Sequence, residues 1–325
     1  MFFIIQYRLS GNNRPRVIFV VQPYIPFLPM EPTLCQAAFD DTDYGFQVKW
    51  DGVRIIAHVK NGIVELFNRK KLIRTKQYPE IVSLLPKLFK SDIILDGEMI
   101  VINDGKPSFS QLIRRDFAVD ERTIKNLKNM IPVTYVAFDI LYNDGKSLVT
   151  HPFQFRDELL KSLLPSKDPV VVTDTFPETG IALFSVVKQA GLEGVVAKKL
   201  ESHYHIGRKN SDWLKIKNRR TLSAIIGGYL SEGQEVRSLF LGVFQDDGFL
   251  YIGRAGSGMT YQESRLLFER LQKSGSPYCP FINPPIANKK QIPHWVNPSI
   301  EVLIEYMDFT DDGYIRHPVI KQIEF

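Results

Sequence analysis

The ten residues QVKWDGVRII, from Gln47 to Ile56, decide how the first half of the chain is organised. The flanks FQV and VRII have the β-branched and aromatic composition of strands, whereas Lys49, Asp51 and Gly52 interrupt them. An Asp-Gly pair between two apolar runs predicts a hairpin turn, so Lys49 is expected at the end of a strand beside that turn. A lysine in this place is either an ordinary surface side chain or an amine aimed at a reaction centre. These ten residues leave both interpretations open.

The composition is that of a globular protein able to bury sizeable cores, because 44% of the 325 residues are hydrophobic and 24% are charged. A chain of this length is long enough for two domains. The formal net charge of +5 favours a polyanionic partner such as nucleic acid. The two distant cysteines, Cys35 and Cys279, form no CxxC pattern, which excludes a zinc ribbon or a disulfide scaffold and fits a reducing cytosol. No apolar run reaches the roughly 18 residues of a membrane span, so a cytoplasmic, nucleoid-associated protein with no membrane partner is expected.

Two regions of different character predict a two-domain α+β protein. From residue 30 to 219, strand-like runs such as Ile93–Ile102 and Val133–Tyr142 alternate with helical patterns such as PEIVSLLPKLF, which predicts an antiparallel-rich domain. From residue 220 to 325, short strands dominate beside one helical stretch, TYQESRLLFERLQ, and this pattern favours a small OB-fold β-barrel. Residues 1–29, which include VIFVVQPYIPFLP, are expected to be a dispensable extension ahead of the globular pattern.

Four further stretches carry charged residues inside strand-like patterns. They are DGEMIV (Asp96–Val101), AFDILY (Ala137–Tyr142), EGVVAKK (Glu193–Lys199) and WLKIK (Trp213–Lys217). Taken singly, each is compatible with an ordinary strand that ends in a turn or carries solvated charges. In the last of them, a period of two places Lys215 and Lys217 on one strand face and Leu214 and Ile216 on the other.

Together with KWDGVR, these stretches resemble, in order and spacing, the successive motifs of the ATP-dependent DNA ligases and their covalent nucleotidyltransferase relatives. The resemblance extends from about Pro32 to the C-terminus, and EYMDFTDDGYIRHP (Glu305–Pro318) is similar to the tail of bacterial end-joining ligase modules. It implies an ATP-grasp-like nucleotidyltransferase (adenylation) domain over residues 30–219, followed by the OB-fold domain. The implied activity is the sealing of 5′-phosphate/3′-hydroxyl breaks in duplex DNA, in repair or end joining.

The resemblance implies that Lys49 is the nucleophile and carries AMP, taken from ATP, as a lysyl phosphoramidate. An attacking amine must be neutral, and neighbouring cations favour the neutral form while they also hold the α-phosphate. The family pattern assigns these cations to Arg54, Lys198, Lys215 and Lys217.

The other family positions take different roles. By resemblance, Glu98 contacts the ribose and a divalent cation, and Glu193 helps to hold that cation, since Mg²⁺ or Mn²⁺ prefers oxygen ligands. Phe138 stacks on adenine, with Asp139 facing the other way. Arg69, in the stretch LFNRK, matches the arginine of the next family motif and is expected near the ribose or the DNA end.

Three places depart from the family pattern, and in one of them Asn68-Arg69-Lys70 stands where the second motif usually reads Ser-Arg-Asn. Many relatives carry Glu where this chain has Gln47. The amide oxygen of Gln47 can still accept a hydrogen bond from the adenine amino group, but without a charge, which predicts looser selectivity for adenine. After Pro318 the relatives continue into an Arg-x-Asp-Lys motif, whereas this sequence reads VIKQIEF with Lys321 as its cation. Slow loading of AMP beside near-normal sealing by preloaded enzyme is therefore expected.

A sealing enzyme must accept any DNA sequence, so contacts to the phosphate backbone are expected. The candidate segments are Ile113–Asp116, Gly207–Asn210, Asn218–Arg220 and Arg254. A monomer acting on nicked or broken duplex DNA is expected, with a Ku-type end-binding protein as a candidate partner. Three alternatives stay open: an RNA ligase, a capping-type nucleotidyltransferase that uses GTP, and a catalytically weak DNA-end-binding protein.

Overall fold

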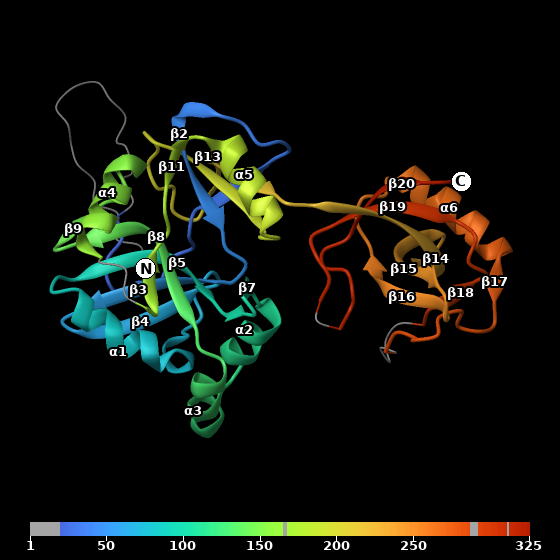
Figure 1. Cartoon of the computed structure of the whole chain (residues 1–325), viewed down its shortest axis with the longest axis horizontal. Coiled ribbons are helices and arrows are strands. Elements are labelled where there is room, and N and C mark those ends of the chain that lie inside the picture. Colours follow the sequence, from blue (N-terminus) through green and yellow to red (C-terminus); the bar gives the residue numbers. More distant parts are fainter. Residues whose placement is uncertain (1–19, 165–167, 287–291, 311) are drawn as a thin grey trace. The chain divides into compact units, whose positions relative to one another are not determined.

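The computed structural model describes residues 20–164, 168–286, 292–310 and 312–325. The chain divides into two compact units, the first extending to Asn218 and the second beginning at Arg219. Both units combine helices with mainly antiparallel sheets (Figure 1), so the expected mixture of the two is present. Among the helices of these described ranges, none is both long enough and apolar enough to cross a membrane.

The first unit is built on two sheets. One contains, in spatial order, β1 (Glu31–Cys35), β13 (Lys209–Lys217), β12 (Gly194–Lys199), β2 (Asp41–Lys49) and β11 (Phe176–Glu178). The other contains β10 (Val170–Val172), β8 (Thr134–Asn143), β5 (Ile93–Ile100), β3 (Val53–Lys60) and β4 (Ile63–Asn68), with β9 (Lys146–Ser147) paired to β8. Neighbouring strands run antiparallel except in the β1–β13 and β10–β8 pairs.

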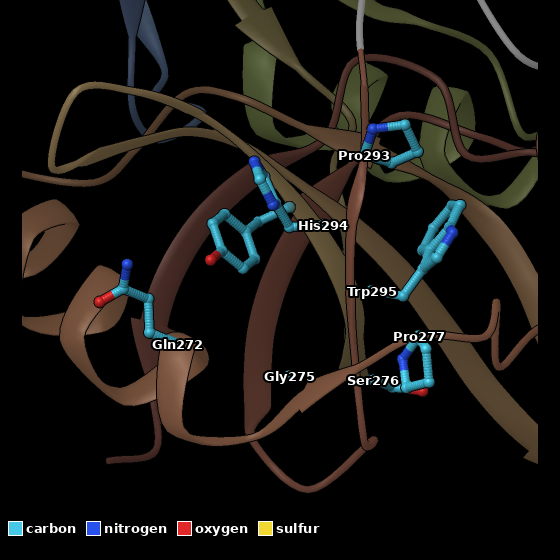
Figure 2. Close-up of a pocket in the computed structure, with 8 residues that line it drawn as sticks. Gln272, Gly275, Ser276, Pro277, Pro293, His294 and Trp295 are labelled. Atoms are coloured by element: carbon cyan, nitrogen blue, oxygen red, sulfur yellow. The ribbon is translucent and has the colours of Figure 1, made fainter.

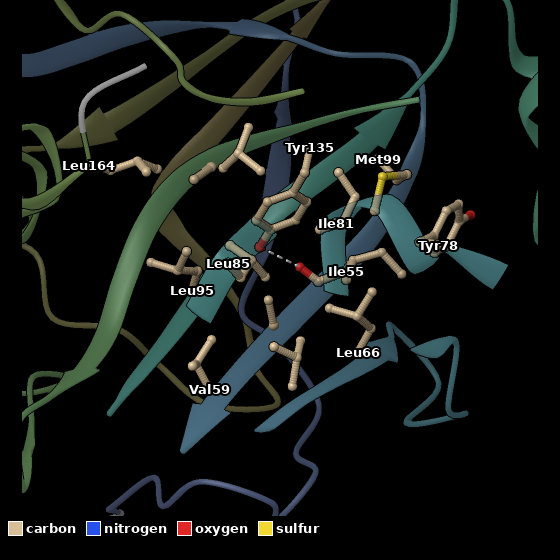
Figure 3. Close-up of a cluster of buried hydrophobic side chains, with 14 of the residues drawn as sticks. Ile55, Val59, Leu66, Tyr78, Ile81, Leu85, Leu95, Met99, Tyr135 and Leu164 are labelled. Carbon is tan, nitrogen blue, oxygen red and sulfur yellow. Dashed lines mark hydrogen bonds between the residues drawn. The ribbon is translucent and has the colours of Figure 1, made fainter. Parts of the chain in front are cut away.

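Helices cover the outer faces of both sheets. They are α1 (Pro79–Leu88), α2 (Phe109–Asp116), α3 (Glu121–Met130), α4 (Phe153–Leu163) and α5 (Gly180–Gln189), with a 3₁₀ turn at Thr75–Gln77 and a small ribbon of β6 (Ile102–Asn103) and β7 (Lys106–Pro107). Apolar side chains of α1, α2 and α4 pack on the sheet that contains β3, β5 and β8. Figure 3 shows part of this core, in which the Tyr135 hydroxyl donates to the Ile55 carbonyl at 3.0 Å. α5 packs on the other sheet through Leu183 and Val187.

A separate apolar cluster joins the two sheets to the start of the described chain. Trp213 of β13 packs with Ile56 of β3 and Leu141 of β8, and the cluster also contains Val21, Phe27 and Met30, all buried. Val21 and Phe27 of the predicted extension are therefore part of the core, which contradicts a dispensable role for the stretch that contains them. The remainder of that predicted extension, residues 1–19, lies outside the described residues.

The hairpin predicted at Asp51-Gly52 is also wrong. Lys49 ends β2 in one sheet and Val53 begins β3 in the other, and these two strands do not pair. The chain instead crosses between sheets at this point. A Cβ added to Gly52 would lie 2.2 Å from the Met99 carbonyl oxygen, so glycine is required by the close approach of β5 rather than by a hairpin turn.

The second unit consists of one antiparallel sheet and one helix, which pack together around a shared apolar core. It contains β14 (Arg220–Glu232), β15 (Glu235–Gln245), β16 (Gly248–Ala255), β17 (Gly275–Ser276), β18 (His294–Val296), β19 (Glu301–Tyr306), β20 (Val319–Ile323) and α6 (Tyr261–Lys273). The helix begins with a capping box, in which Thr260 accepts from the Glu263 amide and the Glu263 carboxylate accepts from the Thr260 amide. Leu267 and Leu271 of α6 lie in the core with the sheet residues.

The closed barrel predicted for this unit is not formed by strand pairing in the described residues. The ladder runs β16-β15-β14-β18-β17, and β19 pairs with β14 and β20, so β16 and β20 are two open ends. Single backbone hydrogen bonds connect this open side: the Ile320 amide donates to Ser257 at 2.9 Å, and the Ile315 amide donates to Ile252 at 2.7 Å.

Candidate active site

Three adjacent strands of the first unit place the predicted lysines on one face of their sheet. The strand register aligns Lys49 of β2, Gly194 of β12 and Lys217 of β13 in one row. The next rows are Gln47–Val196–Lys215 and Gly45–Lys198–Trp213. Side chains of residues directly opposite one another project to the same face of a sheet. The period-two prediction for WLKIK is confirmed, since Leu214 and Ile216 lie on the opposite face.

The amine of Lys49 is held by a carboxylate from the neighbouring strand. Its Nζ donates to Oε2 of Glu193, the residue just before β12, and Lys217 Nζ lies 3.5 Å from the other oxygen, Oε1. The Glu193 side chain is 7% exposed and the Lys49 side chain is 22% exposed. The lysine is therefore fixed in direction but still open to a substrate.

A second carboxylate faces this pair from the other sheet. Glu98 of β5 and Arg54 of β3 are register partners. Burial raises the pKa of Glu98 to about 8, although the charges of Lys49 and Arg54 act in the opposite direction, and Glu193 adds to the increase. These mutual effects show that Glu98 shares one electrostatic environment with Lys49 and Glu193.

Arg54 is held by the buried carboxylate of Asp96. Its Nε and Nη2 donate to the two oxygens of Asp96 at 2.8 Å and 2.5 Å. Its guanidinium carbon lies 5.3 Å from the ring centroid of Phe138 and 5.9 Å from that of Trp213. The orientation of Arg54 over these rings is thus set by a bidentate ion pair.

Phe138 is presented by a β-bulge. In the β5–β8 ladder Asp96 pairs with Asp139 and Gly97 pairs with Ala137, so Phe138 is the extra residue between them. The next residue, Asp139, forms a fully buried bidentate pair with Arg156 at 2.7 and 3.0 Å. Phe138 and Asp139 therefore have separate partners: Arg54 lies over the Phe138 ring, and Arg156 pairs with Asp139.

Lys198 lies at the Phe138 end of the site rather than beside Lys49. Its Nζ donates to the Phe138 carbonyl at 2.9 Å and lies 4.2 Å from the centroid of the Trp213 ring and 4.6 Å from that of the Phe153 ring. Burial lowers the pKa of Lys198 to about 7. Lys198 follows Gly194 by four strand positions, roughly 13 Å along β12, and its amine lies among the Phe138, Phe153 and Trp213 rings.

Gln47 has a defined hydrogen-bonding partner. Its Nε2 donates to the Thr175 hydroxyl at 2.9 Å, and that hydroxyl in turn donates to Asp157 at 2.8 Å. The amide oxygen of Gln47 is consequently the acceptor end of this side chain. Thr175 and Asp157 are not predictable as partners of Gln47, because they lie outside the motifs and only the folded chain brings them to this side chain.

The two remaining predicted cations differ in setting. Burial, together with the charges of Lys217 and Lys49, lowers the pKa of Lys215. Arg69 is exposed, and its Nη1 lies 3.6 Å from Glu31 of β1. Glu31 also acts on the pKa of Lys215, so Arg69 and Lys215 both lie near this carboxylate.

Two of the carboxylates fit the expected divalent cation. No cluster of three or more His, Cys, Asp or Glu side chains suited to a metal occurs among the described residues. Glu98 and Glu193 nevertheless offer hard oxygen donors next to Lys49, and Mg²⁺ usually takes one or two carboxylates with phosphate oxygens and water as the other ligands. The pair fits a cation that arrives with a nucleotide.

Several predicted DNA-contacting cations are occupied within the fold. Arg115 is fully buried and donates to Glu80 at 2.8 Å and to the Ile131 carbonyl at 2.8 Å, so it joins α2 to its neighbours and cannot reach DNA. Arg219 and Arg220 pair with Glu305 and Asp308 within the second unit.

The second unit contains a groove of about 430 Å³ beside α6 (Figure 2). Its lining residues are Tyr229, Gln272, Gly275, Ser276, Pro277, Pro293, His294 and Trp295. The rings of Tyr229 and His294 stack with centroids 5.1 Å apart. None of the predicted site residues lines this groove.

The site therefore consists of a fixed lysine, two flanking carboxylates, a row of cations and an aromatic platform between two sheets, the arrangement of a nucleotide-binding transferase. The family model "ATP dependent DNA ligase domain" matches residues 32–217, and the model "ATP dependent DNA ligase C terminal region" matches residues 232–324. The chain belongs to the ATP-dependent DNA ligase family and is an enzyme of that class.

Individual relatives agree with this family. The chain is 31% identical over 310 residues to the multifunctional non-homologous end joining DNA repair protein LigD of Mycobacterium tuberculosis, a match that covers 94% of this chain and 39% of the relative. It is 31% identical over 193 residues to the SPbeta prophage-derived DNA ligase-like protein LigB of Bacillus subtilis, covering 59% and 67% of the two chains. The solved structure of mycobacterial DNA ligase D complexed with ATP and MES is 29% identical, with a TM-score of 0.55 and coverage of 92% and 95%. The chain spans about two fifths of the length of the LigD relatives that it matches.

Proposed function

We propose that this chain seals 5′-phosphate/3′-hydroxyl breaks in duplex DNA with ATP, and that AMP is carried on Lys49. The observation that supports this most strongly is the position of the Lys49 amine, fixed by Glu193 and flanked by Lys217 on the same sheet face. A surface lysine beside a turn has no need of a nearly buried carboxylate partner.

In the first step the Lys49 nitrogen attacks the α-phosphorus of ATP. A P–N bond forms, the bond to the β-phosphate oxygen breaks, pyrophosphate leaves, and the amine loses its proton. Lys215 and Lys217 lie on the same face as Lys49 and are placed to offset charge on the α-phosphate oxygens. Glu98 and Glu193 would hold the divalent cation, which when bound neutralises phosphate charge.

The adenosine is assigned to the other end of the site. Phe138 offers its ring for stacking, and the amide oxygen of Gln47 accepts from the adenine amino group. Arg54, fixed by Asp96 above the Phe138 ring, would contact the ribose–phosphate part of the nucleotide. We assign Lys198 to holding the Phe138 carbonyl rather than to the α-phosphate.

The later steps use the same phosphoryl chemistry. A 5′-phosphate oxygen of the DNA attacks the phosphorus of lysyl-AMP, which forms a pyrophosphate bridge and returns the Lys49 amine. The 3′-hydroxyl then attacks the DNA phosphorus and expels AMP. Arg69, exposed at the edge of the site, is assigned to the DNA end.

We also propose that the second unit is an OB-fold variant. The hydrogen bonds from Ile320 and Ile315 across the open side of the sheet support this assignment, because they bring the two ends of the ladder together around one core. Since relatives of this chain are named for non-homologous end joining, broken duplex ends are the proposed substrate beside nicks, for a monomer recruited by a Ku-type partner.

A labelling and sealing assay tests this function against the alternatives. Protein incubated with Mg²⁺ and α-labelled nucleotide should gain label from ATP and not from GTP, and should then seal a nicked DNA duplex more rapidly than a nicked RNA duplex. Labelling by GTP would favour a capping-type enzyme, and preference for RNA would favour an RNA ligase. DNA-end binding without any label would contradict the proposed function.

A further inference from the structure

Tyr204 connects the nucleotide site to residues 20–30, here called the N-terminal segment. The residue is 3% exposed, and its ring meets the Trp213 ring edge-on with centroids 5.6 Å apart. The hydroxyl has three polar neighbours: it donates to Asp96 Oδ2 at 2.7 Å, accepts from the Met30 amide at 3.1 Å, and lies 3.4 Å from Arg54 Nη2. A single oxygen thus contacts the main chain of the N-terminal segment and the ion pair of the site.

The Asp96 carboxylate depends on these contacts. It is fully buried, and a buried carboxylate is stable only when its oxygens are paired. Arg54 Nε supplies a donor to one oxygen, while Arg54 Nη2 and the Tyr204 hydroxyl share the other. Without the hydroxyl, Asp96 could rotate with Arg54 attached, and the guanidinium would lose its fixed place above Phe138.

The acceptor side of the hydroxyl is fixed by the backbone. On either side of Met30, the chain is joined to the loop that follows Tyr204: the Gly207 amide donates to the Leu28 carbonyl at 2.7 Å, and the Glu31 amide donates to the Arg208 carbonyl at 2.9 Å. The Met30 amide therefore has little freedom to follow a moving side chain. Burial and the Asp96 charge raise the pKa of Tyr204 well above its usual value, so the hydroxyl stays a donor.

We propose that Tyr204 is a positioning residue of the nucleotide site: its hydroxyl, held by the Met30 amide, fixes the Asp96 carboxylate, which in turn orients the Arg54 guanidinium toward the bound nucleotide. This inference rests on the proposed function. It also gives the N-terminal segment a role in nucleotide binding beyond its contribution to the core.

The direct test compares two buried tyrosines that each lose one hydroxyl. Tyr204→Phe removes the contacts to Asp96 and Met30, whereas the matched control Tyr135→Phe removes one hydrogen bond to Ile55 within the helix-covered core. In single-turnover AMP loading, Tyr204→Phe should raise the half-saturating ATP concentration roughly three- to tenfold and leave the maximal rate within about twofold. Tyr135→Phe should lower the melting temperature about as much as Tyr204→Phe does. It should leave the half-saturating ATP concentration and the maximal rate unchanged.

A double-substitution experiment separates positioning from general loosening. If Tyr204 acts through the guanidinium, Tyr204→Phe should change ATP affinity by less than about twofold in an Arg54→Lys background. Full additivity of the two substitutions would overturn the proposal, as would equal effects of Tyr204→Phe and Tyr135→Phe on ATP affinity.

A measurement on the unmodified chain covers the case in which Tyr204→Phe does not fold. Amide hydrogen exchange at Met30 should slow when AMP is loaded, because nucleotide contact with Arg54 restrains the hydroxyl that accepts from this amide. Unchanged exchange at Met30 in a chain that does load AMP would overturn the inference while leaving the proposed function intact. Failure of the unmodified chain to load AMP would instead contradict the proposed function.

Discussion

Lys49 and Glu193 meet at the end of two paired strands, where the lysine amine donates to a carboxylate that also lies 3.5 Å from Lys217. This carboxylate is shared by the assigned nucleophile and one of the assigned phosphate-binding cations. It is therefore the group through which a cation or nucleotide entering the site would release the amine.

Glu193→Gln tests this sharing. The amide keeps the shape of the side chain but loses the charge that holds Lys49 and would bind a divalent cation, so AMP loading should fall on the order of 100-fold or more. The control Glu201→Gln changes an exposed carboxylate in the same region and should load at the normal rate. Loading by Glu193→Gln within a few-fold of the unmodified chain would contradict the assignment.

The raised pKa of the half-buried Glu98 predicts a pH dependence of stability. Its pKa rises from 4.5 to about 8 on folding, so between these values the folded chain keeps a proton that the unfolded chain has released. The free energy of unfolding should therefore fall as pH rises through this window. Glu98→Gln removes this titrating group. The free energy of unfolding of Glu98→Gln minus that of the unmodified chain should therefore increase by roughly 1–4 kcal/mol as the pH rises through the window. Denaturant unfolding at several pH values measures this, and parallel profiles of the two chains would show that folding does not raise the pKa of Glu98.

Lys198→Met tests whether the hydrogen bond from Lys198 to the Phe138 carbonyl supports nucleotide binding. Methionine can fill the space among the Phe138, Phe153 and Trp213 rings but cannot donate to the Phe138 carbonyl. The half-saturating ATP concentration should rise roughly three- to tenfold, with little change in the maximal loading rate. The neighbouring Lys199 points to the other face of β12, so Lys199→Met is the matched control. A large fall in the maximal loading rate of Lys198→Met would instead indicate that Lys198 contacts the α-phosphate.

Gln47→Glu tests the match between position 47 and its partner. The Thr175 hydroxyl donates its single hydrogen to Asp157, so a carboxylate at position 47 would face an oxygen that has no hydrogen left for it. The substitution should lower the free energy of unfolding by about 1–3 kcal/mol. Adding Asp157→Asn should recover part of the loss, because it frees the hydroxyl hydrogen. If Gln47→Glu alone has the same free energy of unfolding as the unmodified chain, Thr175 does not favour an amide over a carboxylate at position 47.

Much of this site is predictable from the sequence because its residues lie in short, ordered stretches of strand. The alternation in WLKIK is by itself sufficient to place Lys215 and Lys217 on one face. The positions of Lys198 and of the Asp51-Gly52 crossing are not predictable in the same way. Both depend on which strands pair: Lys198 is aligned with Trp213 by the register of β12 and β13, and Gly52 is required by the approach of β5.

The partners that orient the site are the least predictable part. Tyr204 and Thr175 reach Asp96 and Gln47 from segments more than 100 residues away in the chain. Nothing in the local sequence of a tyrosine or threonine marks such a contact. A buried Asp96 does signal the need for a cation, and that signal could have identified the pair with Arg54.

Locating AMP on the chain tests whether Lys49 is the nucleophile. The protein is incubated with ATP and Mg²⁺, digested under conditions that preserve the phosphoramidate, and mapped by mass spectrometry, with Lys49→Arg treated in parallel. One added AMP is expected on the side chain of Lys49 in the unmodified protein, and none is expected on Lys49→Arg. AMP on any other residue, or AMP retained by Lys49→Arg, would contradict the assignment of Lys49 as the nucleophile.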